Sequence, residues 1–213
     1  SAFGSVIAFN RAVDKETAEK MKDLFVEVVV APGYDEEALA IFTQRKNIRL
    51  IDVEADAKVK FGTDLRRVNG GLLVQDFDDS FETRESSTVP SKAKPTEGQW
   101  RDLLFAWKVA KHVKSNTIVY VKDGATMGIG AGQMSRVDSA FLGAKKGGPE
   151  KTKGSVIASD AFFPFADALE VAIEAGATAV IQPGGSVNDE EILRVADEAG
   201  IPMVFTGHRH FRH

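Results

Sequence analysis

The 213-residue sequence contains no cysteine, which excludes a disulfide framework, a thiolate metal site and a cysteine nucleophile. It has no apolar run of the roughly 18 or more residues that a membrane-spanning helix needs, and its first residues lack the layout of a signal peptide. Basic residues are not in excess, with 27 Lys and Arg against 31 Asp and Glu. A net charge of -4 argues against a nucleic-acid or membrane surface, although a local basic cluster could bind a small anion. We therefore expect a cytoplasmic protein.

The sequence repeats itself at long range. Gly-Ser-Val-Ile-Ala occurs at residues 4–8 and again at residues 154–158. Each copy is followed by a helical pattern, an apolar run that ends in Pro-Gly, and an Asp-Glu-Glu that starts a second helical pattern. Ordered internal similarity of this kind marks duplicated units. Alternating strands and helices in both copies predict an α/β protein, a three-layer α/β/α sandwich in two similar lobes.

A polar segment separates the two copies. Residues 85–95 carry two prolines and show no periodicity, which is typical of a linker. We therefore predict residues 1–84 as one repeat, residues 85–95 as a linker, and residues 96–213 as a second, complete repeat. The second repeat begins with the capping-box spacing of Thr96 and Gln99 before a long amphipathic helix.

Periodicity in the rest of the chain predicts the other elements. Asp14 is expected to cap the first helix, and Asp-Gly at 123–124 predicts a hairpin. The basic stretch 145–153 is expected to be a mobile loop. Helices are expected at 35–45, 135–144, 166–175 and 189–199, and strands at 26–31, 50–53, 179–182 and 203–205.

A glycine-rich stretch precedes one of these helices. Gly128, Gly130 and Gly132 stand just before Arg136. Glycines let backbone N–H groups approach an anion, and a helix N-terminus adds positive potential. The spacing fits neither the phosphate loop nor the dinucleotide fingerprint. A tight crossing from hairpin to helix would need the same glycines, so both interpretations stay open.

An aromatic run, Phe162-Phe163-Pro164-Phe165, follows a strand at the point where sheets of this type place their ligand crevice. Its rings could all pack in the core, or one could form a stacking surface for a flat heterocycle. Asp160 and Asp167 beside the run could bind an amino or amide group or cap the next helix. Glu27 interrupts an apolar strand, so it either faces water at a sheet edge or faces a ligand.

Cationic side chains gather at the C-terminus, in Gly207-His208-Arg209-His210-Phe211-Arg212-His213. Such a cluster after a strand end could bind a phosphate or a carboxamide. His208 and His210 have no third ligand in view, so no metal site is expected. Lys111-His112 near the end of the long helix could be an acid–base pair, though a helix C-terminus favours cations without any function.

Several stretches together resemble the AICAR transformylase/IMP cyclohydrolase family of purine biosynthesis, and they cover the chain from end to end. They are Ser1-Ala2-Phe3-Gly4, Ala31-Pro32-Gly33-Tyr34, Lys114-Ser115-Asn116, Gly128-Ile129-Gly130-Ala131-Gly132-Gln133 with Ser135-Arg136, Ser159-Asp160-Ala161-Phe162-Phe163-Pro164-Phe165, and the ending from Arg209 to His213. The resemblance implies the C-terminal part of a transformylase domain, which is built from two cytidine-deaminase-like repeats. Residues 1–84 would then be the C-terminal part of the first repeat.

The resemblance also implies an activity and a site. The reaction is transfer of a formyl group from the co-substrate 10-formyltetrahydrofolate to the 5-amino group of AICAR, which gives FAICAR and tetrahydrofolate. The residues that would bind AICAR are Gly4, Glu27, Asn116, Arg136, Phe162 and Arg209. Those that would contact the folate are Val137, Asp167, Ser186 and Val187. Asn116 and His213 would support catalysis, and a homodimer with sites between protomers is implied.

One departure from the family is expected to matter. The catalytic Lys-His pair of the family lies upstream of Ser1, and Lys111-His112 occupies the place that the family uses structurally. We therefore expect a truncated or cleaved product, or one chain of a split enzyme whose second chain carries the missing segment. The alternative is a non-catalytic nucleotide-binding or assembly subunit.

Overall fold

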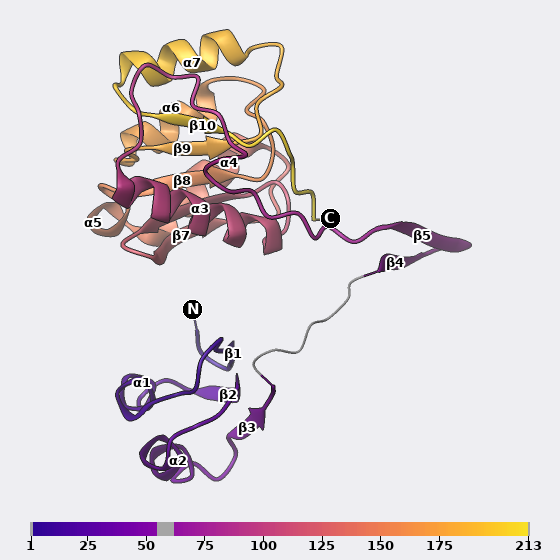
Figure 1. Cartoon of the computed structure of the whole chain (residues 1–213), viewed down its shortest axis with the longest axis vertical. Coiled ribbons are helices and arrows are strands. Elements are labelled where there is room, and N and C mark those ends of the chain that lie inside the picture. The colour runs from indigo at the N-terminus through magenta and orange to yellow at the C-terminus, as the bar shows by residue number, and fades with distance from the viewer. Residues whose placement is uncertain (1, 55–61, 213) are drawn as a thin grey trace. The chain divides into compact units, whose positions relative to one another are not determined.

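The computed structural model describes residues 2–54 and 62–212, and the chain divides into two compact units, Ser1–Phe77 and Asp78–His213 (Figure 1). The elements of the first unit are β1 (Ser5–Ala8), α1 (Lys15–Lys20), β2 (Val26–Ala31), α2 (Glu36–Phe42), β3 (Arg49–Asp52), β4 (Thr63–Val68) and β5 (Gly71–Asp76). Those of the second are α3 (Glu97–His112), β6 (Ile118–Lys122), β7 (Ala125–Gly130), α4 (Arg136–Gly147), α5 (Pro149–Thr152), β8 (Val156–Ser159), α6 (Asp167–Glu174), β9 (Val180–Gln182), α7 (Asp189–Glu198) and β10 (Met203–Phe205).

The first unit is built on a parallel sheet of order β1-β2-β3. Both of its helices have the acidic caps that the sequence indicates, since Asp14 and Asp35 accept hydrogen bonds from backbone N–H groups in the first turns of α1 and α2. Side chains of both helices and of the sheet form one buried cluster that includes Val29 and Phe42. Strands β4 and β5 pair separately as an antiparallel hairpin.

The second unit has three layers. Its mixed sheet has the order β10-β9-β8-β6-β7, with β8, β9 and β10 parallel and β6 antiparallel to both of its neighbours. Alternation along the strands divides their side chains between two cores. One core contains Trp107 of α3, and the other contains Leu169 of α6 and Ile192 of α7. The predicted α/β/α sandwich is confirmed in this unit.

The two units share a five-element pattern. In the first, β1, α1, β2, α2 and β3 follow one another, and in the second β8, α6, β9, α7 and β10 do the same. Each set of three strands is parallel and adjacent in chain order. The duplication inferred from Gly-Ser-Val-Ile-Ala therefore has a structural counterpart, because both copies of that motif contribute to the first strand of the pattern.

Two segments differ from the sequence-based expectation. Residues 85–95, predicted as a linker, pack within the second unit, where Thr88 pairs with Phe205 and the Ser91 hydroxyl accepts a hydrogen bond from the Met203 N–H. The prediction of a mobile loop at 145–153 is wrong. Helix α4 continues to Gly147, Gly148 reverses the chain at a φ of 78°, and Pro149 starts α5. None of the helices in the described ranges is long and apolar enough to cross a membrane.

Candidate functional site

Six of the residues predicted to bind ligands line one cavity of about 400 Å³ in the second unit. They are Asn116, Arg136, Val137, Phe162, Asp167 and Arg209. The sequence analysis did not assign the other described lining residues, which are Met134, Ser135, Ala161, Pro164, Phe165 and Phe211. Phe211 could have been found from its alternation with Arg209, since residues two apart in an extended segment face the same side.

Sheet topology brings these distant segments together. The loop from Asp160 follows the carboxyl end of β8, and the segment with Arg209 follows the end of the parallel strand β10. Strand β6 is antiparallel to β8 and pairs Ile118 with Ser159, so the residues before β6, including Asn116, reach the same edge. Helix α4 begins at the same edge of the sheet, and the Ser135 side chain caps its first turn.

Arg136 is buried and fixes one wall of the cavity. Its guanidinium donates four hydrogen bonds: Nε to the carbonyl of Phe162, Nη1 to Asp160 Oδ1 and Asn116 Oδ1, and Nη2 to Asn116 Oδ1. Burial lowers the pKa of Arg136, and the charge of Asp160 opposes that effect. Since an arginine remains charged even so, the cavity has a permanent positive group beside an oriented amide.

Asp160 supports this wall rather than the helix that follows. Its side chain is fully buried, and Oδ1 accepts from Arg136 at 3.2 Å and from the Thr117 N–H at 3.3 Å. Asp167 is exposed and accepts from the N–H of Ala168, in the first turn of α6. Of the two aspartates, only Asp167 lines the cavity.

The aromatic run divides its rings between core and cavity. Phe163 is fully buried in the core under α6 and α7, whereas Phe162 and Phe165 line the cavity. A half-buried ring beside an arginine offers a surface on which a flat heterocycle can stack.

The glycines before Arg136 serve close packing. A Cβ on Gly128 would lie 2.1 Å from the Gly143 carbonyl oxygen, and one on Gly130 would lie 1.8 Å from that of Ser139. Both positions therefore let β7 approach α4 more closely than any side chain permits. Gly132, at a φ of 66°, donates its N–H to the Lys114 carbonyl. These contacts favour the tight-crossing interpretation over an anion loop.

The other predicted residues lie outside this cavity. Ser186 and Val187 are in the loop before α7, and Asn188 of that loop donates to the Pro164 carbonyl at 2.7 Å. Gly4 and Glu27 adjoin each other in the first unit, where a Cβ on Gly4 would lie 3.6 Å from Glu27 Oε1. Glu27 is exposed, as the water-facing interpretation expects, but it lies on β2, the central strand of the β1-β2-β3 sheet, so its expected place at a sheet edge is wrong. His213 lies outside the described residues.

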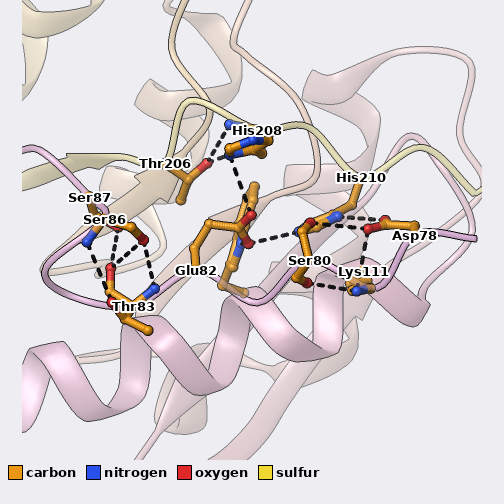
Figure 2. A network of polar contacts seen from close by, with 11 residues as sticks. Asp78, Ser80, Glu82, Thr83, Ser86, Ser87, Lys111, Thr206, His208 and His210 are labelled. Atoms are coloured by element: carbon orange, nitrogen blue, oxygen red, sulfur yellow. Dashed lines mark hydrogen bonds and ion pairs between the residues drawn. The ribbon is translucent and has the colours of Figure 1, made fainter. Parts of the chain in front are cut away.

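A buried polar network was missed by the sequence analysis. Lys111, considered as half of an acid–base pair, is buried and lies 3.3 Å from Asp78 while donating to the Ser80 carbonyl (Figure 2). His210 lies between Asp78 and Glu82. Its partners come from residues 78–82, which the sequence analysis assigned to the first repeat and the structure places in the second unit. Nothing in the local sequence pattern distinguishes these two carboxylates from solvent-exposed ones.

Comparisons with known proteins give matches along the whole chain. A family model described as AICARFT/IMPCHase bienzyme matches residues 1–146. The chain is 56% identical to the bifunctional purine biosynthesis protein PurH of Cereibacter sphaeroides, 57% to that of Dinoroseobacter shibae and 52% to that of Bacillus subtilis. Each alignment covers the whole of this chain but only 41% or 42% of the relative. The chain thus spans about two fifths of the length of these curated relatives.

Proposed function

Because this chain belongs to the AICARFT/IMPCHase bienzyme family, we propose that it is the C-terminal part of the transformylase and supplies much of its AICAR site. The reaction is formyl transfer from 10-formyltetrahydrofolate to the 5-amino group of AICAR. The observation that carries the proposal is the convergence of Asn116, Arg136, Phe162 and Arg209, from separate segments, on one cavity. A homodimer with sites between protomers is part of the proposal.

The chemistry of the cavity matches a phosphorylated imidazole carboxamide. Phe162 provides a face for the ring, and Arg209 at the exposed rim provides a cation for the phosphate. The Asn116 amide accepts from Arg136 and donates to the carbonyls of Gln133 and Met134, and so fixes the wall against which the carboxamide would lie. Val137 and Asp167 lie along the same cavity and are proposed to contact the folate, together with Ser186 and Val187 of the neighbouring loop.

The proposed reaction needs a base that the described lining of this cavity does not supply. The 5-amino group is a weak nucleophile because its lone pair is drawn into the ring carboxamide, so transfer needs a base and a held geometry. The described lining of the cavity includes no lysine or histidine. Lys111 is held in an ion pair with Asp78 and is not free to act as the base. We therefore propose that the base comes from an upstream segment or a second chain.

Turnover tests this proposal. The purified chain is assayed with AICAR and 10-formyltetrahydrofolate, alone and together with the upstream segment of the Bacillus subtilis relative. We expect no turnover by the chain alone and restored turnover with the segment. AICAR binding without turnover under both conditions would instead favour the alternative, a non-catalytic nucleotide-binding subunit.

A matched pair of arginine variants tests the binding site itself. Loss of one charged hydrogen-bonding partner should weaken AICAR binding by about ten- to a hundredfold in Arg209→Ala. Arg194→Ala is the control, because Arg194 pairs with Glu198 on the surface of α7, away from the cavity lining. Calorimetric titration with AICAR and with its unphosphorylated riboside measures the effect. Arg209→Ala should bind AICAR more weakly than the control does, whereas both variants should bind the riboside equally. Equal binding by both variants would contradict the assigned role of Arg209.

A further inference from the structure

A buried histidine lies between the two residues that the C-terminal segment contributes to the cavity. Arg209 and Phe211 line the cavity, while His210 is only 2% exposed. His210 Nδ1 is 2.6 Å from Asp78 Oδ2, and Nε2 is 3.2 Å from Glu82 Oε2 (Figure 2). Ionised carboxylates only accept hydrogen bonds, so both ring nitrogens have to donate, and this is possible only in the imidazolium form.

The charges around the ring balance only with that form. Asp78 also pairs with Lys111 at 3.3 Å, and Glu82 Oε2 accepts from Trp107 Nε1 at 2.6 Å. Burial raises the pKa of each carboxyl, but the hydrogen bonds and charges around it together outweigh burial, so both pKa values lie below their ordinary range. At Asp78 these come from His210 and Lys111, and at Glu82 from Trp107, the Glu82 backbone N–H and His210. Two carboxylates therefore face Lys111 and His210, and a neutral His210 would leave a buried negative charge.

The remaining titratable groups near the ring are more exposed. On the C-terminal segment, His208 Nδ1 is 3.5 Å from Glu82 Oε1, with a side chain 68% exposed, and Arg212 is exposed. On α3, His112 is exposed, and burial followed by the charges of Arg212 and Lys111 lowers its pKa. The Trp107 ring covers one side, with its centroid 4.8 Å from that of His210. Among the described residues, no group of three or more His, Cys, Asp or Glu side chains is arranged to hold a metal ion.

His210 is the main anchor of the segment that follows β10. Residues 207–212 contain no helix or strand, and His210 is the buried side chain among them. Backbone groups add a bond from the Gly207 N–H to the Pro183 carbonyl, one from the His210 N–H to the Asp160 carbonyl and a pair between Arg212 and Ser115. Release of the ring would therefore remove the buried side-chain contacts of His210 from the middle of the segment.

We propose that His210 is a positioning residue: its imidazolium, held between Asp78 and Glu82, fixes residues 207–212 so that Arg209 and Phe211 stay in the wall of the cavity. The effect on substrate rests on the proposed function, whereas the clamp itself does not. Replacement of the ring removes both of its hydrogen bonds from the clamp, and substrate binding should weaken accordingly.

Hydrogen–deuterium exchange of the protein at its natural length tests the clamp without any assay of activity. In His210→Leu, the peptide covering residues 206–212 should lose protection by about tenfold or more relative to the unmodified protein. His208→Leu is the matched control, because it removes an exposed imidazole from the same segment, and its protection should equal that of the unmodified protein.

Asp78→Asn separates positioning from simple stability. Lys111 orients the side-chain oxygen of the new asparagine toward itself, so the amide NH₂ can donate to a neutral His210 at Nδ1 while Nε2–H still donates to Glu82. This variant should keep the segment protected. A role in stability alone predicts loss of protection in Asp78→Asn, as in His210→Leu.

Kinetics connect the clamp to the cavity. KM for AICAR should rise by about tenfold in His210→Leu and stay near that of the unmodified protein in Asp78→Asn, with kcat changed less than KM in both. Protection that survives in His210→Leu overturns the clamp. Protection that changes while KM does not overturns its link to the cavity. Absence of all turnover in the unmodified protein together with its upstream segment refutes the proposed function instead, and the exchange measurements still decide the role of His210.

Discussion

At the scale of single residues, Gly130 shows how one missing side chain sets the distance between two elements. A Cβ at this position would lie 1.8 Å from the carbonyl oxygen of Ser139 in α4, and that oxygen belongs to the backbone of the helix, which cannot rotate away. We predict that Gly130→Ala lowers the free energy of unfolding by about 1–3 kcal/mol, measured by urea denaturation.

Gly98→Ala is the control for that prediction. Gly98 lies in the first turn of α3, and the nearest atom to a Cβ there is 3.9 Å away. Alanine suits a helix better than glycine, so this variant should be unchanged or more stable by up to about 1 kcal/mol. Equal stability of the two variants would show that β7 and α4 are not packed as closely as described.

Residue identity was enough to predict some local features but not others. Asp14 and the pair Thr96 and Gln99 cap their helices as predicted, because a cap depends only on residues three positions apart. The roles of Asp78 and Glu82 could not be predicted. Their partner His210 is more than a hundred residues away in the sequence, and an exposed carboxylate has the same local pattern as a buried one.

At the scale of elements, the N-terminus of α4 connects stability with the cavity. Ser135 caps this helix by accepting from the Asp138 N–H, and it lines the cavity together with the next residues, Arg136 and Val137. We predict that Ser135→Ala costs about 1 kcal/mol of stability and also weakens AICAR binding, because the fraying turn carries Arg136. Unfolding curves and calorimetric titration measure the two effects.

The cap of α3 provides the comparison. Thr96→Ala removes a capping-box hydroxyl and should cost a similar amount, about 1 kcal/mol, but Thr96 does not line the cavity. AICAR affinity should therefore stay unchanged. If both variants lose affinity equally, the effect of Ser135→Ala reflects general destabilisation and not the placement of Arg136.

At the scale of the whole molecule, each unit has its own interior. Every buried cluster of described residues draws its members from a single unit. Phe42 is fully buried in the first unit, and Leu169 is fully buried in the second. We predict two calorimetric transitions, one for each unit. Phe42→Ala should lower the free energy of unfolding of the first unit only, and Leu169→Ala that of the second unit only, each by about 2–5 kcal/mol. A single transition that both variants lower together would contradict independent unfolding.

The sequence by itself determined the features that depend on nearby residues or on repetition. Hydrophobic periodicity predicted strand β10 at residues 203–205, Asp-Gly predicted the β6–β7 hairpin, and the repeated Gly-Ser-Val-Ile-Ala predicted the five-element pattern that both units contain. It failed at residues 145–153, where a lysine-rich composition concealed the end of α4 and the whole of α5.

Only the tertiary structure decided which side chains meet. The antiparallel entry of β6 carries Asn116 to the carboxyl ends of β8 and β10, where Arg136, Phe162 and Arg209 line the same cavity. The same folding places His210 between two carboxylates. Burial and long-range pairing fix the charge state of such groups. Both arise from strand order and from the geometry of the crossings, and neither leaves a local periodicity in the sequence. This is the physical reason why the sequence alone could not predict them.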